Sequence, residues 1–177
     1  QHLISAVALG EQGWTTLSFH LSEDSAFIVL DQARLALEQL NGLEARVNQL
    51  IRQGLSVQPR LASAADLDGG RIRCRKLPDV QAGGLRLVDI DGIDLNTCGG
   101  THVENTAAIQ MIRLTKTEPH RGAVRVFFEA GGRVLSRSRH DAAVHHEVNQ
   151  LLSCSVHQYA DTIRRIQKDA KALLKQN

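Results

Sequence analysis

The sequence has few aromatic residues, few cysteines, no long apolar run and almost no net charge. Aromatic residues make up 3% of the chain, so its core must be built from leucine, isoleucine, valine and alanine. Three cysteines, Cys74, Cys98 and Cys154, are an odd and sparse set that argues against a disulfide framework. Such cysteine usage is typical of a reducing compartment and predicts a cytoplasmic protein.

The lack of a long apolar run and of a strong net charge also limits the possible contacts with membranes and nucleic acids. No apolar run approaches the ~20 residues that cross a bilayer, so we expect no membrane partner. The segment 1–9 is too short for a span and lacks the basic flank of a signal peptide. A net charge of +2 gives no molecule-wide positive field, so any contact with nucleic acid must come from local patches.

What remains is the composition of an ordinary folded domain, with 177 residues, 42% hydrophobic and 23% charged. Residues 14–21 and 25–30 are predicted to form a hairpin. Asp31 is a plausible N-cap for a long helix with one apolar stripe, which Gly54 would end. We expect the other strands at residues 55–61, 71–77, 85–90, 109–117 and 122–129. The pattern predicts an α+β fold with an antiparallel or mixed sheet packed on a long helix.

The composition becomes helical from about residue 133, which predicts C-terminal helices. The last of these carries apolar residues at alternating four- and three-residue steps, a short heptad-like seam. Its members are Tyr159, Ile163, Ile166, Ala170 and Leu173. Two heptads do not hold a coiled coil alone, so helix-mediated self-association is one expected use of this seam.

The most informative local feature is the sequence Cys-Gly-Gly-Thr-His-Val at residues 98–103. It places a thiolate and an imidazole, both preferred ligands of tetrahedral zinc, four residues apart on one turn. Gly99 and Gly100 remove bulk from that turn and permit positive φ values. The alternative is a buried Cys98 beside an unrelated loop His102. The strand predicted at 85–90 favours the metal site, because a strand that ends in a ligand turn holds it in place.

A further candidate ligand, His2, begins the apolar helical stretch at residues 2–9. A lone histidine at the start of a helix is more often a cap or a surface group. The residues around it, Gln-His-Leu-Ile-Ser-Ala-Val at 1–7, are what raise His2 to a candidate ligand.

Taken together, these segments resemble the alanyl-tRNA synthetase editing-domain family and its free-standing AlaX-type members. Residues 1–7 are similar to the second half of that family's H-x-x-x-H helix, and residues 98–103 to its second signature. The segments 104–109 and 125–135 are similar to AlaX-type proteins as well, so the resemblance covers essentially the whole chain. It implies an editing domain at residues 1–132, followed by a helical extension at residues 133–177.

One departure from the family pattern concerns the first histidine of the helix motif. It would lie four residues before His2, upstream of residue 1. We therefore expect a chain that begins inside the motif, without the barrel-like domain that precedes editing domains in the family. His2, Cys98 and His102 then supply three of the four metal ligands that the resemblance implies.

The resemblance implies an enzyme that acts in trans on mischarged tRNA for alanine and hydrolyses the ester of seryl-tRNA, with glycyl-tRNA as a second substrate. The implied cofactor is Zn²⁺, which could polarise the ester or activate water. It could equally position the substrate, since a site with four protein ligands is closed. Two alternatives are an editing domain of the threonyl-tRNA synthetase type and a non-enzymatic, zinc-stabilised RNA-binding module.

Three threonines are candidate catalytic residues. The resemblance places a polar residue just after Trp14 within reach of the bound amino acid, which favours Thr15 and then Thr16 as readers of the seryl hydroxyl. A site that bonds a hydroxyl rejects the analogue without it far better than an apolar pocket rejects an added one. Thr101 lies between two candidate ligands and could face the metal. Threonines also simply favour strands and turns.

Two groups of basic residues are candidates for contacts with tRNA phosphates. One lies at residues 71–76 and the other on the last helix, at Arg164, Arg165, Lys168, Lys171 and Lys175. The alternative is that both are merely solvated surfaces. Asp94 and Asn96 could support the ligand turn or accept an N–H from a ligand histidine.

Overall fold

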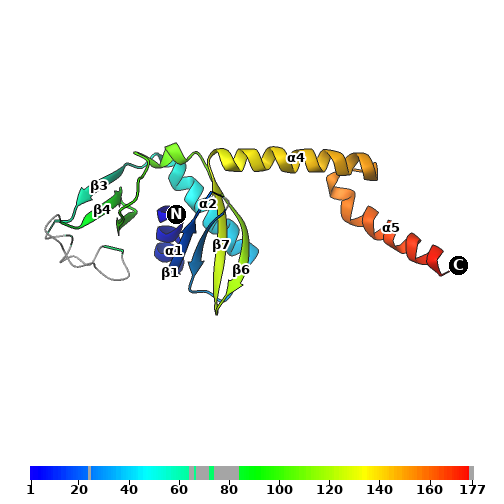
Figure 1. The fold of residues 1–177 in the computed structure, drawn as a ribbon, viewed down its shortest axis with the longest axis horizontal. Coiled ribbons are helices and arrows are strands. Elements are labelled where there is room, and N and C mark those ends of the chain that lie inside the picture. Colours follow the sequence, from blue (N-terminus) through cyan, green and yellow to red (C-terminus); the bar gives the residue numbers. More distant parts are fainter. Residues whose placement is uncertain (24, 64–65, 67–71, 74–83, 176–177) are drawn as a thin grey trace. The chain divides into compact units, whose positions relative to one another are not determined.

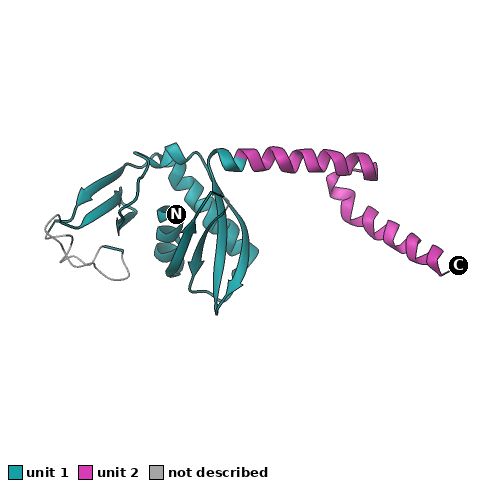
Figure 2. Ribbon diagram, viewed as in Figure 1, with its two compact units in different colours: residues 1–134 teal, residues 135–177 magenta. Residues whose placement is uncertain are grey.

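The computed structural model describes residues 1–23, 25–63, 66, 72–73 and 84–175. The chain divides into two compact units, Gln1–Val134 and Leu135–Asn177 (Figure 2). The first unit combines helices with two antiparallel sheets, and the second is helical (Figure 1). The α+β fold class is confirmed.

A four-stranded sheet in the order β1-β2-β7-β6 is the framework of the first unit. Its strands are β1 (Thr16–Leu21), β2 (Ala26–Leu30), β6 (Ile112–His120) and β7 (Ala123–Ala130). Both predicted hairpins form, and β2 pairs with β7 to join them. The inward side chains of β2 and β7, Ile28, Leu30, Val124 and Val126, are no more than 1% exposed. An aliphatic core, as the composition predicted, is therefore confirmed.

The long helix α2 (Leu37–Gln53) contributes Leu43, Val47 and Leu50 to the same core as the sheet residues. Two of its polar side chains also contact the edge strand β6: Asn48 bonds the N–H and the C=O of Ile112, each at 2.9 Å. Glu44 accepts a hydrogen bond from the backbone N of Leu114 at 2.6 Å. The helix therefore packs against the sheet and also satisfies part of its open edge.

The start of α2 corrects one expectation. Asp31 is not the N-cap, because its carboxylate accepts the backbone N–H of Thr15 at 2.8 Å and so fixes the β1–β2 pair. The helix begins six residues later, after Ala36, whose N–H is bonded by the side chain of Gln39 at 2.9 Å. Its end at Gly54, with φ of 65°, is as predicted.

The expected single sheet is also corrected, since three strands form a separate sheet in the order β3-β4-β5. These are β3 (Val57–Leu61), β4 (Arg86–Ile90) and β5 (Asp94–Thr97). Pro59 is tolerated in β3 because this is an edge strand. The short, polar β5 was not predicted. Of the strand predicted at residues 71–77, Ile72 and Arg73 are described, Arg73 bridging to Asn96, and the rest lies outside the described residues.

The short helix α1 (His2–Gln12) packs on α2 and β5 through a buried run from Leu3 to Ala8. It ends at Gly13, whose φ is 70°, a value that glycine adopts without strain. This ending turns the chain back so that the N–H of Trp14 bonds the C=O of Ala8 at 2.9 Å. The α1–β1 connection is therefore tight, and it brings the start of β1 next to α1.

The second unit is formed by α4 (Gly132–Leu152), which begins in the first unit, a short 3₁₀ turn (Val156–Gln158) and α5 (Tyr159–Leu174). Within it, the Tyr159 hydroxyl donates to the C=O of His145 at 2.7 Å and lies 2.6 Å from Oδ1 of Asn149. The helix break predicted at Cys154–Ser155 is observed at Ser153, which has φ of 50°. Among the described residues, no helix has the length and apolar character to span a membrane.

Candidate metal centre

His2 occupies the first turn of α1, with its backbone held because the Ser5 N–H bonds the C=O of Gln1 at 3.1 Å. The apolar face of α1 is buried, so the position of the helix leaves little freedom to the residue at its start. The His2 side chain is 15% exposed. A histidine that was ambiguous in the sequence is thus fixed at the edge of the core.

Cys98 and His102 lie on the turn after β5, and hydrogen bonds to neighbouring elements hold both ends of this turn. The Arg86 guanidinium, on β4, donates a hydrogen bond to the C=O of Cys98. Past His102, the fully buried Thr106 donates its hydroxyl to the C=O of Leu50 at 2.9 Å and accepts the N–H of Leu55 at 2.9 Å. The ligand turn is therefore anchored at one end to the small sheet and at the other to the end of α2.

The glycines of this turn, Gly99 and Gly100, keep it free of bulk, as expected, but they do not adopt the positive φ values that were also expected. A Cβ added at Gly100 would lie 3.6 Å from Sγ of Cys98 and 3.9 Å from Cε1 of His102. Glycine therefore keeps the space beside two candidate ligands free of a side chain.

The three predicted ligand residues converge. One ligand atom from each of His2, Cys98 and His102 lies within 4.8 Å of the others. The imidazole rings of His2 and His102 have centroids 5.1 Å apart. All three residues are partly buried. Within the described part of the chain, they form the group of three or more His, Cys, Asp or Glu side chains that could hold a metal ion.

The electrostatics of the two histidines suit metal binding. Burial lowers the pKa of His2 to about 4, with added repulsion from Arg73 and His102. Burial, and then the charge of Arg86, also lower the pKa of His102. Both imidazoles are therefore neutral near neutral pH, which is the form that ligates metals.

The hydrogen-bonding state of these rings is a second indication. Nδ1 of His2 and Nδ1 of His102 are buried, and neither has a hydrogen-bond partner among the described residues. Buried polar atoms without partners are rare, and an ion or water commonly satisfies them. For Nδ1 of His2 the carboxylate of Asp94 is the alternative partner, and in that case Nε2 is the nitrogen left for a metal. A thiol and two neutral imidazoles within reach of one point fit Zn²⁺ better than a hard cation, which prefers oxygen.

A buried carboxylate, Asp94 at the start of β5, lies behind His2. Its Oδ2 is 3.9 Å from Nδ1 of His2, longer than a hydrogen bond. Arg73 holds both carboxylate oxygens, with Nε at 2.7 Å from Oδ1 and Nη2 at 2.6 Å from Oδ2. Since His2 is neutral, this contact is not an ion pair. It places an acceptor near the ring nitrogen, as the sequence suggested for Asp94.

Arg73 therefore does not act as expected. It belonged to a predicted phosphate-binding group at residues 71–76, but its guanidinium is engaged with Asp94 and is 20% exposed. The other basic members of that group, Arg71, Arg75 and Lys76, lie outside the described residues, as does Cys74. Cys154 is partly buried in the second unit, far along the chain from the metal centre.

A cavity of about 750 Å³ opens beside the candidate ligands. His2, Cys98, Thr15 and Thr16 all line it. The Thr16 hydroxyl donates to Oγ of Ser5 at 2.8 Å. Two of the three threonines are therefore next to the metal centre, and Thr16 is bonded to a side chain of α1.

Ser5 is a site residue that the sequence reasoning missed. It lines the cavity, is 1% exposed, and also accepts a hydrogen bond from the Gln1 amide at 3.0 Å. A signal was present, since Ser5 follows His2 by three residues and shares its helix face. It was the polar position in an apolar run, and serine in a buried helix needs a hydrogen-bond partner.

The other two threonines have different surroundings. Thr15 is exposed, and its backbone N–H is bonded to Asp31. Thr101 is exposed and is not among the residues that line the 750 Å³ cavity. Its assignment as a catalytic residue stays a prediction.

With the geometry established, comparison with known proteins identifies relatives. Residues 85–126, which include Cys98 and His102, match the family described as "Threonyl and Alanyl tRNA synthetase second additional domain". All of this chain aligns at 35% identity with 43% of the alanyl-tRNA editing protein Aarsd1-A of Xenopus laevis. It aligns at 36% identity with 43% of the mouse protein Aarsd1. This chain is a homologue of the alanyl-tRNA editing proteins.

The same relationship extends to a synthetase. Over 94% of its length, this homologue of the editing proteins is 28% identical to 20% of the alanine–tRNA ligase of Thermoplasma acidophilum. The resemblance to the alanyl-tRNA synthetase editing-domain family is thus confirmed. The chain spans less than half the length of the curated editing proteins that it matches.

Proposed function

We propose that this chain hydrolyses the ester bond of mischarged tRNA for alanine, with seryl-tRNA as its main substrate and glycyl-tRNA as a second. The observation that carries this proposal is the convergence of His2, Cys98 and His102 within 4.8 Å beside a 750 Å³ cavity. Its homology to alanyl-tRNA editing proteins supports the choice of reaction and of tRNA.

We assign the cofactor as Zn²⁺, held by His2, Cys98 and His102. When bound, zinc supplies a Lewis acid that can polarise an ester carbonyl or lower the pKa of a water molecule. The chain's own contribution is to keep both imidazoles neutral by burial and to fix the ligand turn through Arg86 and Thr106. Asp94, held by Arg73, is the acceptor that would orient His2.

Recognition of serine is assigned first to Thr16 and then to Thr15. The Thr16 hydroxyl donates a hydrogen bond to Oγ of Ser5. The lone pairs of its oxygen remain available, so it can accept a hydrogen bond from a seryl hydroxyl. An alanyl ester offers no such donor and gains nothing from this acceptor. Thr15 borders the same cavity and is the alternative. Thr101 is the third catalytic candidate, through its position between Cys98 and His102.

The division of labour along the chain is part of this proposal. Editing is assigned to residues 1–132, which hold every candidate ligand, and residues 133–177 are assigned as a helical extension. We place the activity in the cytoplasm, where its substrate is made, and expect no disulfide to be needed. The threonyl-type editing domain and the non-enzymatic zinc module are the alternatives that an assay must separate.

A deacylation assay tests the proposal. The protein is incubated with seryl-tRNA and alanyl-tRNA for the alanine tRNA, and with seryl-tRNA for the threonine tRNA. We expect hydrolysis of the first substrate alone. Hydrolysis of the third substrate would favour the threonyl type, and hydrolysis of none would favour a binding module.

Cys98→Ser and Cys154→Ser form a matched pair for this assay, because both remove one thiol from a partly buried cysteine. Loss of a metal ligand should reduce the rate more than the ~10–100-fold typical of residues that only support a ligand. Cys154→Ser should retain the parent's rate and zinc content. Equal activity of both variants would contradict the metal centre.

A further inference from the structure

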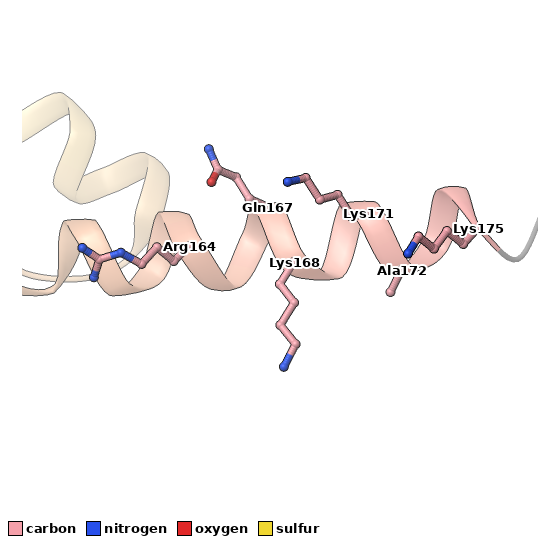
Figure 3. A pocket seen from close by; sticks show the side chains of 6 residues that line it. All are labelled: Arg164, Gln167, Lys168, Lys171, Ala172 and Lys175. Atoms are coloured by element: carbon pink, nitrogen blue, oxygen red, sulfur yellow. The ribbon is translucent and has the colours of Figure 1, made fainter.

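The last helix, α5, carries a charged face that the candidate metal centre does not use. Four basic residues, Arg164, Lys168, Lys171 and Lys175, follow one another at steps of four, three and four residues. With 3.6 residues per turn, these positions fall within about 60° of one another around the helix. We call this set the α5 stripe. Figure 3 looks onto this face: Arg164 and Lys175 lie along the helix, and the side chains of Lys168 and Lys171 diverge to the two edges of the stripe.

The stripe is accessible and concentrates the charge of the chain. Its residues border a shallow groove on the surface of α5, with Gln167 and Ala172 between them. Residues 159–175 hold five basic and two acidic residues, a net charge of +3, whereas the whole chain carries +2. The remainder of the chain is thus almost neutral. The chain as a whole has no strong positive field, but this one helix provides a local one.

The acidic residues of α5 do not cancel the stripe. Asp161 accepts a hydrogen bond from Arg164 at 2.8 Å, but their side chains are 86% and 73% exposed. Exposed pairs of this kind contribute little free energy and exchange readily with other partners. Asp169 lies about 100° from Lys168 on the helix and so outside the stripe.

We propose that the α5 stripe binds the phosphate backbone of the tRNA whose aminoacyl ester the metal centre hydrolyses. This inference rests on the proposed function, which supplies an RNA substrate. A row of flexible cations along a helix neutralises phosphates without reading sequence, and it raises affinity and association rate. The stripe would hold the body of the tRNA, while the metal centre acts on its esterified end.

The arrangement favours RNA over an anionic lipid surface. The exposed apolar residues of α5, Ile163, Ile166, Leu173 and Leu174, form a face whose centre lies about 140° around the helix from the centre of the stripe. A helix that lies in a membrane interface buries its apolar face, with its cations beside that face at the level of the headgroups. Here an apolar face turned toward lipid would point the stripe away from the headgroups.

The test compares two double variants of the full chain that remove the same charge. Lys168→Gln with Lys171→Gln removes two cations of the stripe, and Arg34→Gln with Arg165→Gln removes two exposed cations outside it. Arg165 lies on the same helix, about 100° from Arg164. Glutamine has nearly the helix propensity of lysine and arginine, so helicity measured by circular dichroism should stay constant.

Binding of uncharged alanine tRNA is measured across a series of salt concentrations. For the stripe variant, the slope of log affinity against log salt should fall by about 1.4 to 1.8, since each phosphate contact contributes about 0.7 to 0.9. The control variant should keep the parent's slope. Equal slopes for the two variants, whether reduced or unchanged, would overturn the proposal. So would loss of binding to phosphatidylserine vesicles with tRNA binding intact.

Kinetics separate this inference from the proposed function. The stripe variant should raise KM for seryl-tRNA and leave kcat unchanged, and it should hydrolyse a seryl ester of a short RNA end as fast as the parent. If the parent hydrolyses seryl-tRNA but the stripe variant keeps its KM and its salt slope, the inference is wrong and the proposed function stands. If the parent binds tRNA through the stripe but hydrolyses no ester, the proposed function is wrong and the inference about the stripe stands.

Discussion

The two units of this chain use their apolar residues in opposite ways. In Gln1–Val134, helices α1 and α2 and the four-stranded sheet enclose a core in which Ile28, Leu30 and Val126 are completely buried. In Leu135–Asn177, Ile163, Ile166 and Leu174 of α5 are 43%, 49% and 78% exposed. A domain core holds the first unit together, whereas the second has helices with open faces. The first unit can therefore hold side chains in a fixed geometry, and the second offers surface.

This contrast suits the two units to the two different functions that we propose for them. A metal centre requires ligand atoms held within a few tenths of an ångström, and a buried framework provides that precision. Contact with a phosphate backbone tolerates mobile side chains, because charge and not shape supplies its free energy. Self-association through the apolar seam of α5 would also use an open face, and it stays a prediction.

The largest expected effect comes from a matched pair of isoleucines, one in each unit. Ile28→Ala should destabilise the protein by about 2 to 5 kcal/mol, because it removes a fully buried side chain and leaves a cavity. Ile166→Ala, at a residue 49% exposed, should change the free energy of unfolding by no more than about 0.5 kcal/mol. Urea denaturation followed by circular dichroism measures both. A large loss for Ile166→Ala would show that the α5 face is covered in solution.

The next largest effect concerns the support of His2. Asp94→Asn should weaken zinc affinity about 10- to 100-fold, because the acceptor near the His2 ring is reduced in charge. Asp91→Asn, three residues earlier in an exposed turn, is the control and should bind zinc as the parent does. Competition titration with a chromogenic chelator measures both affinities.

Asp94→Asn also weakens the pairing of Arg73, so a loss of stability must be separated from a loss of affinity. The two readouts are a melting curve without metal and the shift that added zinc produces. A variant that melts early but gains the parent's full zinc shift would show that Asp94 supports the fold and not the ligand.

A smaller effect is expected for substrate recognition. Thr16→Val should reduce hydrolysis of seryl-tRNA by the value of one hydrogen bond, about 1 to 2 kcal/mol, which is about 5- to 30-fold. Zinc content and tRNA affinity should not change. Thr15→Val is the comparison. A larger loss of seryl-tRNA hydrolysis in that variant would show that Thr15, the residue that the sequence favoured, recognises the seryl hydroxyl.

The last prediction concerns the pH dependence of the metal-free protein. In the folded chain the pKa of His2 is about 4, below its ordinary value of 6.5, mainly through burial. Below pH 6.5 the unfolded chain therefore binds more protons than the folded one, so stability falls as the pH falls from about 6.5 to about 4. Zinc affinity should fall over the same range, because protonated imidazole is not a ligand.

Helix α5 contains no histidine, so its helicity should change little between pH 6.5 and about 5. Melting curves across this range measure the loss of stability, and NMR of the His2 ring shows whether this residue titrates in step with it. A His2 pKa near 6.5 would contradict its burial at the metal centre.

Much of the fold followed from local patterns. Alternating β-forming residues predicted both hairpins of the four-stranded sheet, and a helical stripe ending at Gly54 predicted α2 and its end. The start of α2 could not be predicted, because Asp31 has two possible partners and takes the N–H of Thr15. Strand β5 was missed because four mostly polar residues carry no periodic signal and owe their conformation to pairing with β4.

For the candidate site, the sequence alone determined which residues bring the chemistry. Cys98 and His102 are four residues apart on one turn, so their proximity was settled by covalent geometry. His2 was identified by resemblance, and its distance from them was open until α1 was seen to pack on β5. The tertiary structure also decided what surrounds the ligands: the carboxylate of Asp94 behind His2, and Ser5 bonded to Thr16.

The division has a simple physical cause. Local spacing specifies contacts within a turn or along one helix, and these include the ligand turn and the α5 stripe. The contacts of α1 with β1 and β5 depend instead on burying the apolar residues of α1, a force without direction that no short motif encodes. Only the packed core therefore decides which polar side chains meet at the metal centre.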